Sequence, residues 1–296
     1  MKSLHLSWRM LPLCALLSLF VLSCQKTNNP STPSSRQQTD ALLMSATNTV
    51  VEAGNLEGQD VEDIAGPDSV PDCRVVTFDT SRTVYPHVKT IDFGTGCTGP
   101  DGITRSGKKI ITYYANPDTA PIGTQFSLTT YDSFYVSGVN VTGTIKSYID
   151  SSSTAGTPVF KNVAEKTLAA SNGDSKTVNS TNYWKKIEGA NTMIHSDDVF
   201  EITGSGYGNE TLDGATEIEW TAQVDSAHHV IKPASCYWRT QGALDIQLHI
   251  ITGGDANFTE YLDYGDGTCD DKATLSINGG TAQEVTLPLF FWPLSL

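Results

Sequence analysis

The chain is short of positive charge. Its 296 residues contain 19 Lys and Arg against 33 Asp and Glu, which gives a formal net charge of −14 at pH 7. Binding to polyanions depends on many contacts from Lys and Arg, so a surface of this sign repels nucleic acid and anionic headgroups. The composition therefore argues against nucleic acid as a partner.

The sequence also lacks the short motifs of common catalytic sites. It contains no Gly-x-Ser-x-Gly, no His-Glu-x-x-His, no phosphate loop and no dinucleotide fingerprint. The stretch TGSGYGNE, residues 203–210, is rich in glycine, but it precedes a predicted strand rather than a helix whose N-terminus could bind phosphate. These absences favour a protein that is not an enzyme, and they leave open a pair of carboxylates that only the fold brings together.

No apolar run in the first residues is long enough to span a bilayer comfortably. The run from Met10 to Leu22 follows Lys2 and Arg9, which is the build of an export signal. It ends in VLSC, residues 21–24, which resembles the lipobox of bacterial lipoproteins. The resemblance implies cleavage before Cys24 and acylation of it, for example with palmitate. An ordinary signal peptide with an incidental cysteine is the alternative.

The lipobox resemblance also sets the expected location. The residue after the cysteine is Gln25, where Asp would suggest retention in the inner membrane, so the outer membrane of the cell envelope is favoured, on either its periplasmic or its surface face. Acyl chains on Cys24 would then be the contact with the membrane.

The local composition and residue pattern divide the chain into four regions. Residues 1–23 are the predicted signal peptide, and residues 24–39, rich in Ser, Thr, Asn and Pro, are a flexible tether. Residues 40–70 carry apolar positions at helical spacing in pieces, which predicts a helical lead-in of one or two short helices. Residues 71–296 form a β-rich domain, with two similar halves as one possibility.

The β-rich domain is predicted from repeated segments of alternating apolar and polar residues. Segments such as TEIEWTAQV and ALDIQLHII are rich in Val, Ile, Thr and aromatic residues, and turn signals separate them. The Asn172-Gly173 pair predicts a hairpin with a type I′ turn. The expected fold is all-β, an antiparallel meander that forms a sandwich or an open half-barrel.

Four further cysteines lie in the β-rich domain. Cys73 begins the predicted strand CRVVTFD, and Cys97 follows the returning strand VKTIDFG; Cys236 begins CYWRTQGALDIQLHI in the same way, and Cys269 follows FTEYLDYG. The start of one strand faces the end of the next in an antiparallel hairpin, so this order favours disulfides between Cys73 and Cys97 and between Cys236 and Cys269. The motifs DFGTGC and DYGDGTC are then interpreted as two copies of one turn, with chance similarity as the alternative.

Both motifs lie within longer segments that resemble a known family. IDFGTGCTGPDGITRSGKKIITY, TTYDSFYVSGVNVTGT and LDYGDGTCDDKATLSING together resemble a group of uncharacterised outer-membrane lipoproteins from Bacteroidota with paired DFGxGC and DYGDGxC motifs. The resemblance covers most of residues 73–287. It implies an exported, β-rich lipoprotein and brings no activity or catalytic residues.

Few side chains suggest a cofactor. Asp263, Asp266 and Asp270, on the second glycine-rich turn, could ligate Ca²⁺, which prefers several oxygen ligands; the alternative is solvated turn residues that accept capping hydrogen bonds. If His228 and His229 lie on a strand, they point to opposite faces and cannot share a metal ion there. No other cofactor is expected.

Trp184, Trp220 and Trp238 lie in predicted strands, where core packing is favoured over an exposed face that binds sugar or lipid. The apolar end EVTLPLFFWPLSL is expected to dock as an edge strand.

The leading hypothesis from the sequence is an outer-membrane lipoprotein whose β-rich domain is a binding or structural module for an envelope component, a glycan or a lipid. A glycan-acting hydrolase with paired carboxylates, or a lipid carrier, is the alternative.

Overall fold

The computed structural model shows an almost entirely β-stranded body. It describes residues 73–99, 103–154, 156–190, 192, 195–212, 214–252 and 255–287. The predicted signal peptide, the tether with Cys24, the helical lead-in of residues 40–70 and the apolar end after Leu287 lie outside this part of the chain. Within it the one helical element is a single 3-10 turn, η1 (His195–Asp197). No helix among the described residues is long and apolar enough to cross a membrane.

Fifteen strands make up the described body. They are β1 (Val75–Phe78), β2 (His87–Asp92), β3 (Cys97–Thr98), β4 (Thr104–Tyr113), β5 (Gln125–Val136), β6 (Val139–Ile149), β7 (Val159–Ala169), β8 (Ser175–Glu188), β9 (Val199–Leu212), β10 (Thr216–Val224), β11 (Val230–Pro233), β12 (Gln241–Ile250), β13 (Ala256–Asp266), β14 (Lys272–Ile277) and β15 (Gln283–Thr286).

All of these strands belong to one antiparallel sheet. Its order is β1-β2-β4-β5-β6-β7-β8-β9-β10-β12-β13-β14-β15, with β3 paired to β4 and β11 paired to both β9 and β12. The end strands β1 and β15 do not pair with each other, so the sheet is not a closed barrel. The all-β antiparallel meander is therefore confirmed, because most strands pair with their neighbours in sequence.

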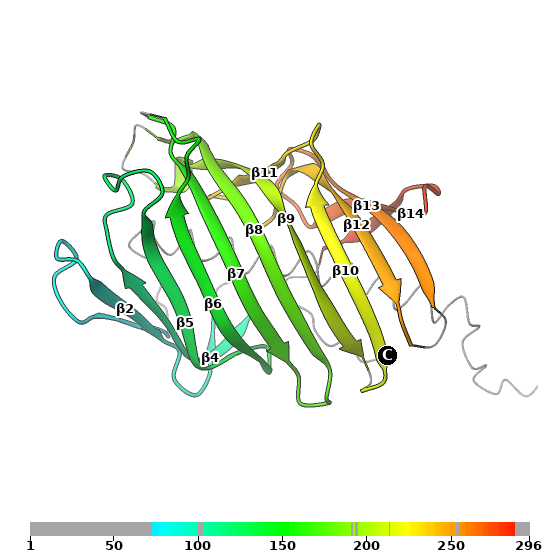
Figure 1. Cartoon of the computed structure of the whole chain (residues 1–296), viewed down its shortest axis with the longest axis horizontal. Coiled ribbons are helices and arrows are strands. Elements are labelled where there is room, and N and C mark those ends of the chain that lie inside the picture. Colours follow the sequence, from blue (N-terminus) through cyan, green and yellow to red (C-terminus); the bar gives the residue numbers. More distant parts are fainter. Residues whose placement is uncertain are drawn as a thin grey trace, which may run out of the picture.

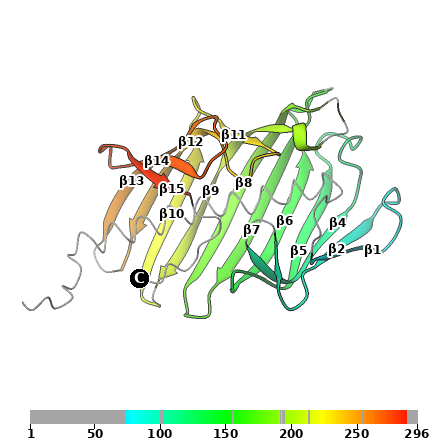
Figure 2. The ribbon, with the colours of Figure 1, turned by 180° about the vertical axis from the view of Figure 1, so that it is seen from behind.

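The sheet is curved, and its two faces differ. Figures 1 and 2 show β1 and β2 at one end and β14 and β15 at the other, bent to the same side of the long central strands. We call the buried face the inner face; it includes Trp220, Leu248 and Leu262. The residues that alternate with these along each strand form the outer face, and on β10 every second residue is exposed. The alternation of apolar and polar residues in the sequence arises because only one face of the sheet contacts solvent.

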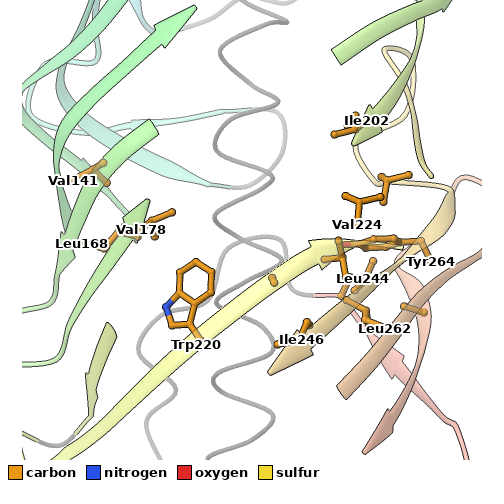
Figure 3. Packing of buried hydrophobic residues seen from close by; sticks show 14 of the residues in the cluster. Val141, Leu168, Val178, Ile202, Trp220, Val224, Leu244, Ile246, Leu262 and Tyr264 are labelled. Atoms are coloured by element: carbon orange, nitrogen blue, oxygen red, sulfur yellow. The ribbon is translucent and has the colours of Figure 1, made fainter. Parts of the chain in front are cut away.

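The inner face carries one large apolar cluster. Figure 3 shows Val141, Leu168 and Val178 on one part of the sheet and Leu244 and Tyr264 on another, projecting toward a common interior. A smaller cluster, made of Ile91, Ile111 and Tyr113, lies near the β1 end. Burial of this apolar surface is the main stabilising contribution to the fold.

The glycine-rich stretch at residues 203–210 has a packing role. It lies inside β9 and the next element is strand β10, so no helix begins after it, as expected. Its alternate glycines leave the inner face of β9 without side chains. The Trp220 indole occupies that space: a Cβ atom added to Gly208 would lie 2.9 Å from its ring and 1.9 Å from the Thr177 carbonyl oxygen. The glycines of this stretch thus make room for a buried tryptophan.

Both predicted disulfides are present. Cys73 is bonded to Cys97 with a Cα–Cα distance of 5.5 Å, and Cys236 to Cys269 with a distance of 5.8 Å. Cys236 lies in the connection before β12 rather than at the start of a strand, since β12 begins only at Gln241.

The two copies of the cysteine phrase share one local geometry. In the first, Asp92 Oδ1 accepts a hydrogen bond of 2.8 Å from the Gly94 backbone N–H; in the second, Asp263 Oδ1 accepts one of 2.9 Å from Gly265. Both glycines have positive φ, 59° and 100°. The aspartate and the glycine are therefore the residues that turn the strand toward its cysteine.

The hairpin between β7 and β8 forms at Asn172-Gly173, but its turn type differs from the prediction. Of these two residues, Gly173 alone has positive φ, at 98°. The Gly173 N–H donates to the Ala170 carbonyl, and the Ala170 N–H donates to the Asp174 carbonyl. This is the pattern of a type I turn followed by a left-handed glycine, in which one extra residue removes the need for positive φ at Asn172.

Candidate functional site

One strand of the sheet is interrupted by an excursion of the chain. Gln223 of β10 pairs with Ser205 of β9, and Val230 of β11 pairs with Ile202 of β9. The chain thus uses seven residues from Gln223 to Val230 where β9 uses three. The pairs Val224–Leu244 and Ile231–Gln241 give the same difference against β12. Strands β10 and β11 therefore form one line in the sheet, and residues 225–229, which we call the insertion loop, leave it.

The insertion loop is held at both ends by one residue of β12. The Asp225 N–H donates to the Ala243 carbonyl at 2.9 Å, and the Ala243 N–H donates to the His228 carbonyl at 2.9 Å. Gly242, at φ 93°, makes this possible, because a Cβ atom there would lie 2.1 Å from the His229 carbonyl oxygen. Bulges of this kind often re-aim side chains near functional sites.

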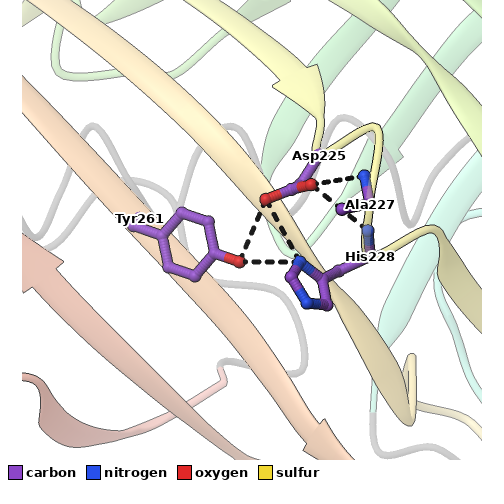
Figure 4. Close-up of polar contacts among 4 residues, drawn as sticks. All are labelled: Asp225, Ala227, His228 and Tyr261. Carbon is purple, nitrogen blue, oxygen red and sulfur yellow. Dashed lines mark hydrogen bonds and ion pairs between the residues drawn. The ribbon is translucent and has the colours of Figure 1, made fainter.

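Three side chains meet where the insertion loop returns over the outer face. We call Asp225, His228 and Tyr261 the loop cluster (Figure 4). The Tyr261 hydroxyl donates to Asp225 Oδ2 at 3.1 Å and lies 3.4 Å from His228 Nδ1, which is 3.3 Å from the same carboxylate oxygen. The other carboxylate oxygen, Oδ1, accepts from the backbone N–H groups of Ala227 at 2.6 Å and His228 at 3.2 Å.

This geometry shifts two pKa values in opposite directions. The hydrogen bond from the Ala227 backbone, followed by the contact with His228, lowers the pKa of Asp225 below its ordinary value. Partial burial, followed by the hydrogen bond to Asp225, raises the pKa of Tyr261 to about 12. Near neutral pH the cluster thus holds a carboxylate that accepts and a phenol that donates.

Further carboxylates surround the cluster on the outer face. Asp245 is the cross-strand neighbour of Tyr261, and Asp263 lies two residues along β13; both add to the rise in the Tyr261 pKa. On the opposite side of the loop, His229 Nδ1 lies 3.5 Å from Glu201 Oε2, and Lys185 Nζ lies 3.6 Å from Glu201 Oε1.

A second exposed histidine cluster lies on the same face. His249 Nε2 is 2.9 Å from Asp255 Oδ1, and His249 Nδ1 is 3.5 Å from Glu219 Oε2. The hydrogen bond to Asp255, followed by that to Glu219, raises the pKa of His249. Unlike the loop cluster, this one involves no interruption of the sheet.

The loop cluster can recognise polar groups. Its His228 side chain is 63% exposed, so the imidazole is open to a ligand while the carboxylate beside it is only 18% exposed. The cluster offers hydrogen-bond acceptors and donors to hydroxyl or amine groups. Among the described residues, no group of three or more His, Cys, Asp or Glu side chains is arranged to hold a metal ion.

The three aspartates predicted as Ca²⁺ ligands each serve a local turn. Asp263 Oδ1 accepts from the Gly265 N–H; Asp266 Oδ1 accepts from the Thr268 N–H at 3.1 Å and hydroxyl at 2.8 Å; Asp270 Oδ1 accepts from the Lys272 N–H at 2.9 Å. The bonds from the Thr268 hydroxyl and N–H lower the pKa of Asp266. Ca²⁺ binding here stays a prediction.

The condition of the histidine prediction, that both residues lie on a strand, is not met. His228 and His229 do not lie on a strand; they belong to the insertion loop, because the chain leaves the sheet after Val224 and rejoins it at Val230. His228 turns toward Asp225 and His229 toward Glu201, so each has its own carboxylate.

The tryptophans follow the core prediction. Trp184 and Trp220 are 2% and 3% exposed and belong to the inner-face cluster, with Trp238 packed at its margin.

The loop cluster was not predicted from the sequence. A sequence feature that could have indicated it is the polar stretch DSAHH between the segments TEIEWTAQV and VIKP. This stretch is longer than a simple bulge. Tyr261 carries no such signal, because its partner lies 36 residues away.

Comparisons with protein-family models, with curated proteins and with solved structures found no match to this chain. The case for its function therefore depends on the residues and geometry described above.

Proposed function

We propose that the chain is an outer-membrane lipoprotein, anchored through acylated Cys24, whose β domain is an open half-barrel that binds an envelope glycan on its outer face. The observation that carries this proposal is the loop cluster, in which Asp225, His228 and Tyr261 converge at an interrupted strand. Sequence supports the anchor, through the export signal and the VLSC stretch at residues 21–24.

The outer face around the cluster supports a long polar ligand. A row of cross-strand neighbours runs through Ser205, Gln223, Asp245, Tyr261 and Ser276, each on a different strand. Adjacent strands lie about 4.8 Å apart, so such a row presents hydroxyl, amide and carboxylate groups at regular intervals. A polysaccharide has hydroxyl groups spaced along its whole length and could follow this row.

The neighbouring row adds an aromatic ring. It runs through Tyr207, Thr221, Gln247 and Thr259. Tyr207 is 61% exposed, and an exposed aromatic face can stack on a sugar ring. The negative net charge and the carboxylates beside Tyr261 favour neutral or amino sugars over acidic ones.

The alternatives have less support. A hydrolase needs a carboxyl group that holds a proton near neutral pH. Burial raises the pKa of Glu260 to about 8, but Glu260 lies on the inner face, opposite to Tyr261 on β13. A lipid carrier would need an open apolar concavity, whereas the apolar side chains of the inner face are buried and the rows beside the loop cluster are polar.

Calorimetric titration of the purified protein with soluble neutral glycans tests the proposal. Binding that weakens in Tyr261→Phe and Asp225→Asn supports it, and absence of binding to every neutral or amino-sugar glycan would reject it.

A further inference from the structure

A second group of polar side chains lies on the long central strands of the sheet. Tyr148 on β6, Lys161 on β7 and Tyr183 on β8 are successive cross-strand neighbours, and these three strands lie side by side in Figure 1. Lys146 lies two residues before Tyr148 on β6, so its side chain leaves the same face of the sheet. We call these four residues the basic-aromatic patch.

The patch lies on the outer face, like the loop cluster. Lys146 begins a line of cross-strand neighbours that continues through Val163 and Thr181 to Ser205. From Ser205 the row described above leads to Tyr261. The side chains of the patch are partly exposed. Six strand steps, about 29 Å in total, separate Lys146 from Tyr261, so the patch and the loop cluster are distinct places on one face.

The two lysines of the patch form no ion pair with a carboxylate among the described residues. They are diagonal neighbours on adjacent strands, because Lys161 pairs with Tyr148, two residues from Lys146. Diagonal positions lie about 7–8 Å apart, so the two positive charges repel each other. An anion bound between them would relieve this repulsion.

Three carboxylates border the patch. Glu201 lies 3.6 Å from Lys185, which is a separate ion pair. Asp150 Oδ1 accepts hydrogen bonds from the Ser152 N–H at 2.9 Å and from its hydroxyl at 2.8 Å or less. Glu165 is exposed on β7. Within the described ranges none of the three pairs with a lysine of the patch, so both ammonium groups remain available to a ligand.

The two tyrosines flank Lys161 at a spacing that suits a sugar chain. Tyr148 and Tyr183 are two strand steps apart, about 10 Å, with Lys161 between them. This is close to the length of two sugar units in an extended polysaccharide. Aromatic rings can stack on sugars, and both hydroxyls lack a hydrogen-bond partner in the part of the chain that the structure describes, so they can donate to sugar oxygens.

We propose that the basic-aromatic patch binds a glycan in which a carboxylate-bearing sugar is flanked by neutral sugars. The carboxylate lies between Lys146 and Lys161, and the flanking sugars contact Tyr148 and Tyr183. The formal net charge of −14 favours an isolated acidic unit, because the rest of the protein repels a chain with a charge on every sugar.

An anionic lipid surface matches the patch less well. Attachment to such a surface uses clusters of roughly four to eight Lys and Arg, whereas the patch has two lysines. The inference goes beyond the proposed function, which concerns neutral and amino sugars at the loop cluster, and each can fail without the other.

Calorimetric titration of the full chain with a hyaluronan hexasaccharide at low salt tests the proposal. In this probe a carboxylate-bearing sugar alternates with a neutral N-acetylated sugar. We expect saturable binding that is about fivefold weaker in Lys161→Gln and that weakens as salt is added, because the contact is an exposed ion pair. Lys272→Gln, which removes an exposed lysine on β14, should bind as the parent chain does.

The tyrosines and the carboxylate are tested separately. Tyr183→Ala should weaken binding, whereas Tyr183→Phe, which keeps the ring, should retain most of it. A chitin hexasaccharide, which lacks the carboxylate, should show no difference between the parent chain and Lys161→Gln. An unchanged near-ultraviolet circular dichroism spectrum will show that each variant is folded.

Four results would each overturn the proposal. They are absence of hyaluronan binding in the parent chain, equal affinities in Lys161→Gln and Lys272→Gln, and binding of phosphatidylglycerol vesicles in place of the hexasaccharide. The fourth is loss of hyaluronan binding in Tyr261→Phe with none in Lys161→Gln, which would assign the acidic glycan to the loop cluster.

Discussion

The Tyr261 hydroxyl donates a 3.1 Å hydrogen bond to Asp225 across a gap of 36 residues in sequence. Tyr261 lies on β13 and Asp225 follows β10, while β12 lies between these strands in the sheet. The bond therefore ties the insertion loop to a strand that is not its ladder neighbour. It stabilises the loop in the conformation that exposes His228.

Removal of this bond should loosen the insertion loop. In Tyr261→Phe we expect a loss of about 0.5–1.5 kcal/mol in the free energy of unfolding, because one partly buried hydrogen bond is lost. Hydrogen exchange at the Ala227 and His228 amides should become faster, since their acceptor, Asp225, loses its anchor. Tyr207→Phe, which removes an exposed hydroxyl on the same face, is the control. Equal exchange rates in both variants would contradict this role of Tyr261.

Glu260 should make the protein less stable as pH rises. Its pKa is about 8 in the folded chain against an ordinary value of 4.5, so the native state keeps a proton that the unfolded chain loses. Between about pH 4.5 and pH 8 the free energy of unfolding should fall by at most about 1.4 kcal/mol per pH unit from this group. Glu260→Gln should remove that slope in urea titrations at several pH values. Glu165→Gln, an exposed change on β7, should leave it; a wild-type slope in Glu260→Gln would contradict the assignment.

Gly208 should tolerate no side chain. A methyl group there would meet the Thr177 carbonyl oxygen and the Trp220 ring, so we expect Gly208→Ala to cost about 2–4 kcal/mol in unfolding free energy. Nothing lies within 4 Å of a Cβ atom at Gly96, and Gly96→Ala should change stability little. Thermal melting compares the two variants directly. Similar melting temperatures would show that Trp220 does not need the glycine surface of β9.

Each disulfide should contribute to stability through the unfolded chain. The sequence separations are 24 and 33 residues, for which loop closure predicts about 3–4 kcal/mol each. Paired Cys→Ser variants at Cys73 and Cys97, or at Cys236 and Cys269, should lower the denaturant midpoint accordingly. Mass measurement before and after reduction checks the bonds themselves; four free thiols in the exported protein would refute the pairing.

Much of the fold could be predicted from patterns among residues close together in the sequence. The disulfides followed from the position of each cysteine relative to its hairpin, and the all-β class followed from alternation of apolar and polar residues along β10 and β12. The type I′ turn at Asn172-Gly173 was wrong because the same dipeptide also fits a longer loop with one left-handed glycine.

The candidate site was harder to predict, since it depends on register. The polar break DSAHH does not by itself show whether the chain leaves the sheet or continues the strand; the pairing of β9 and β12 with both β10 and β11 shows that it leaves. Ala243, which holds both ends of the insertion loop, directly follows the bulge between Gln241 and Ala243 on β12, and that bulge is also a feature of register. Such long-range register is set by the whole sheet, not by local propensity.

Glycan binding at the loop cluster is the central claim, and calorimetry with the full chain measures it most directly. Soluble fragments of neutral and amino-sugar polysaccharides should give saturable binding. Tyr261→Phe and Asp225→Asn should each weaken it about tenfold, the effect of losing roughly 1.4 kcal/mol of hydrogen bonding. Glu165→Gln, an exposed change on β7, should bind as the parent chain does. Absence of heat with every such glycan, or equal affinity in the loop-cluster variants, would contradict the account.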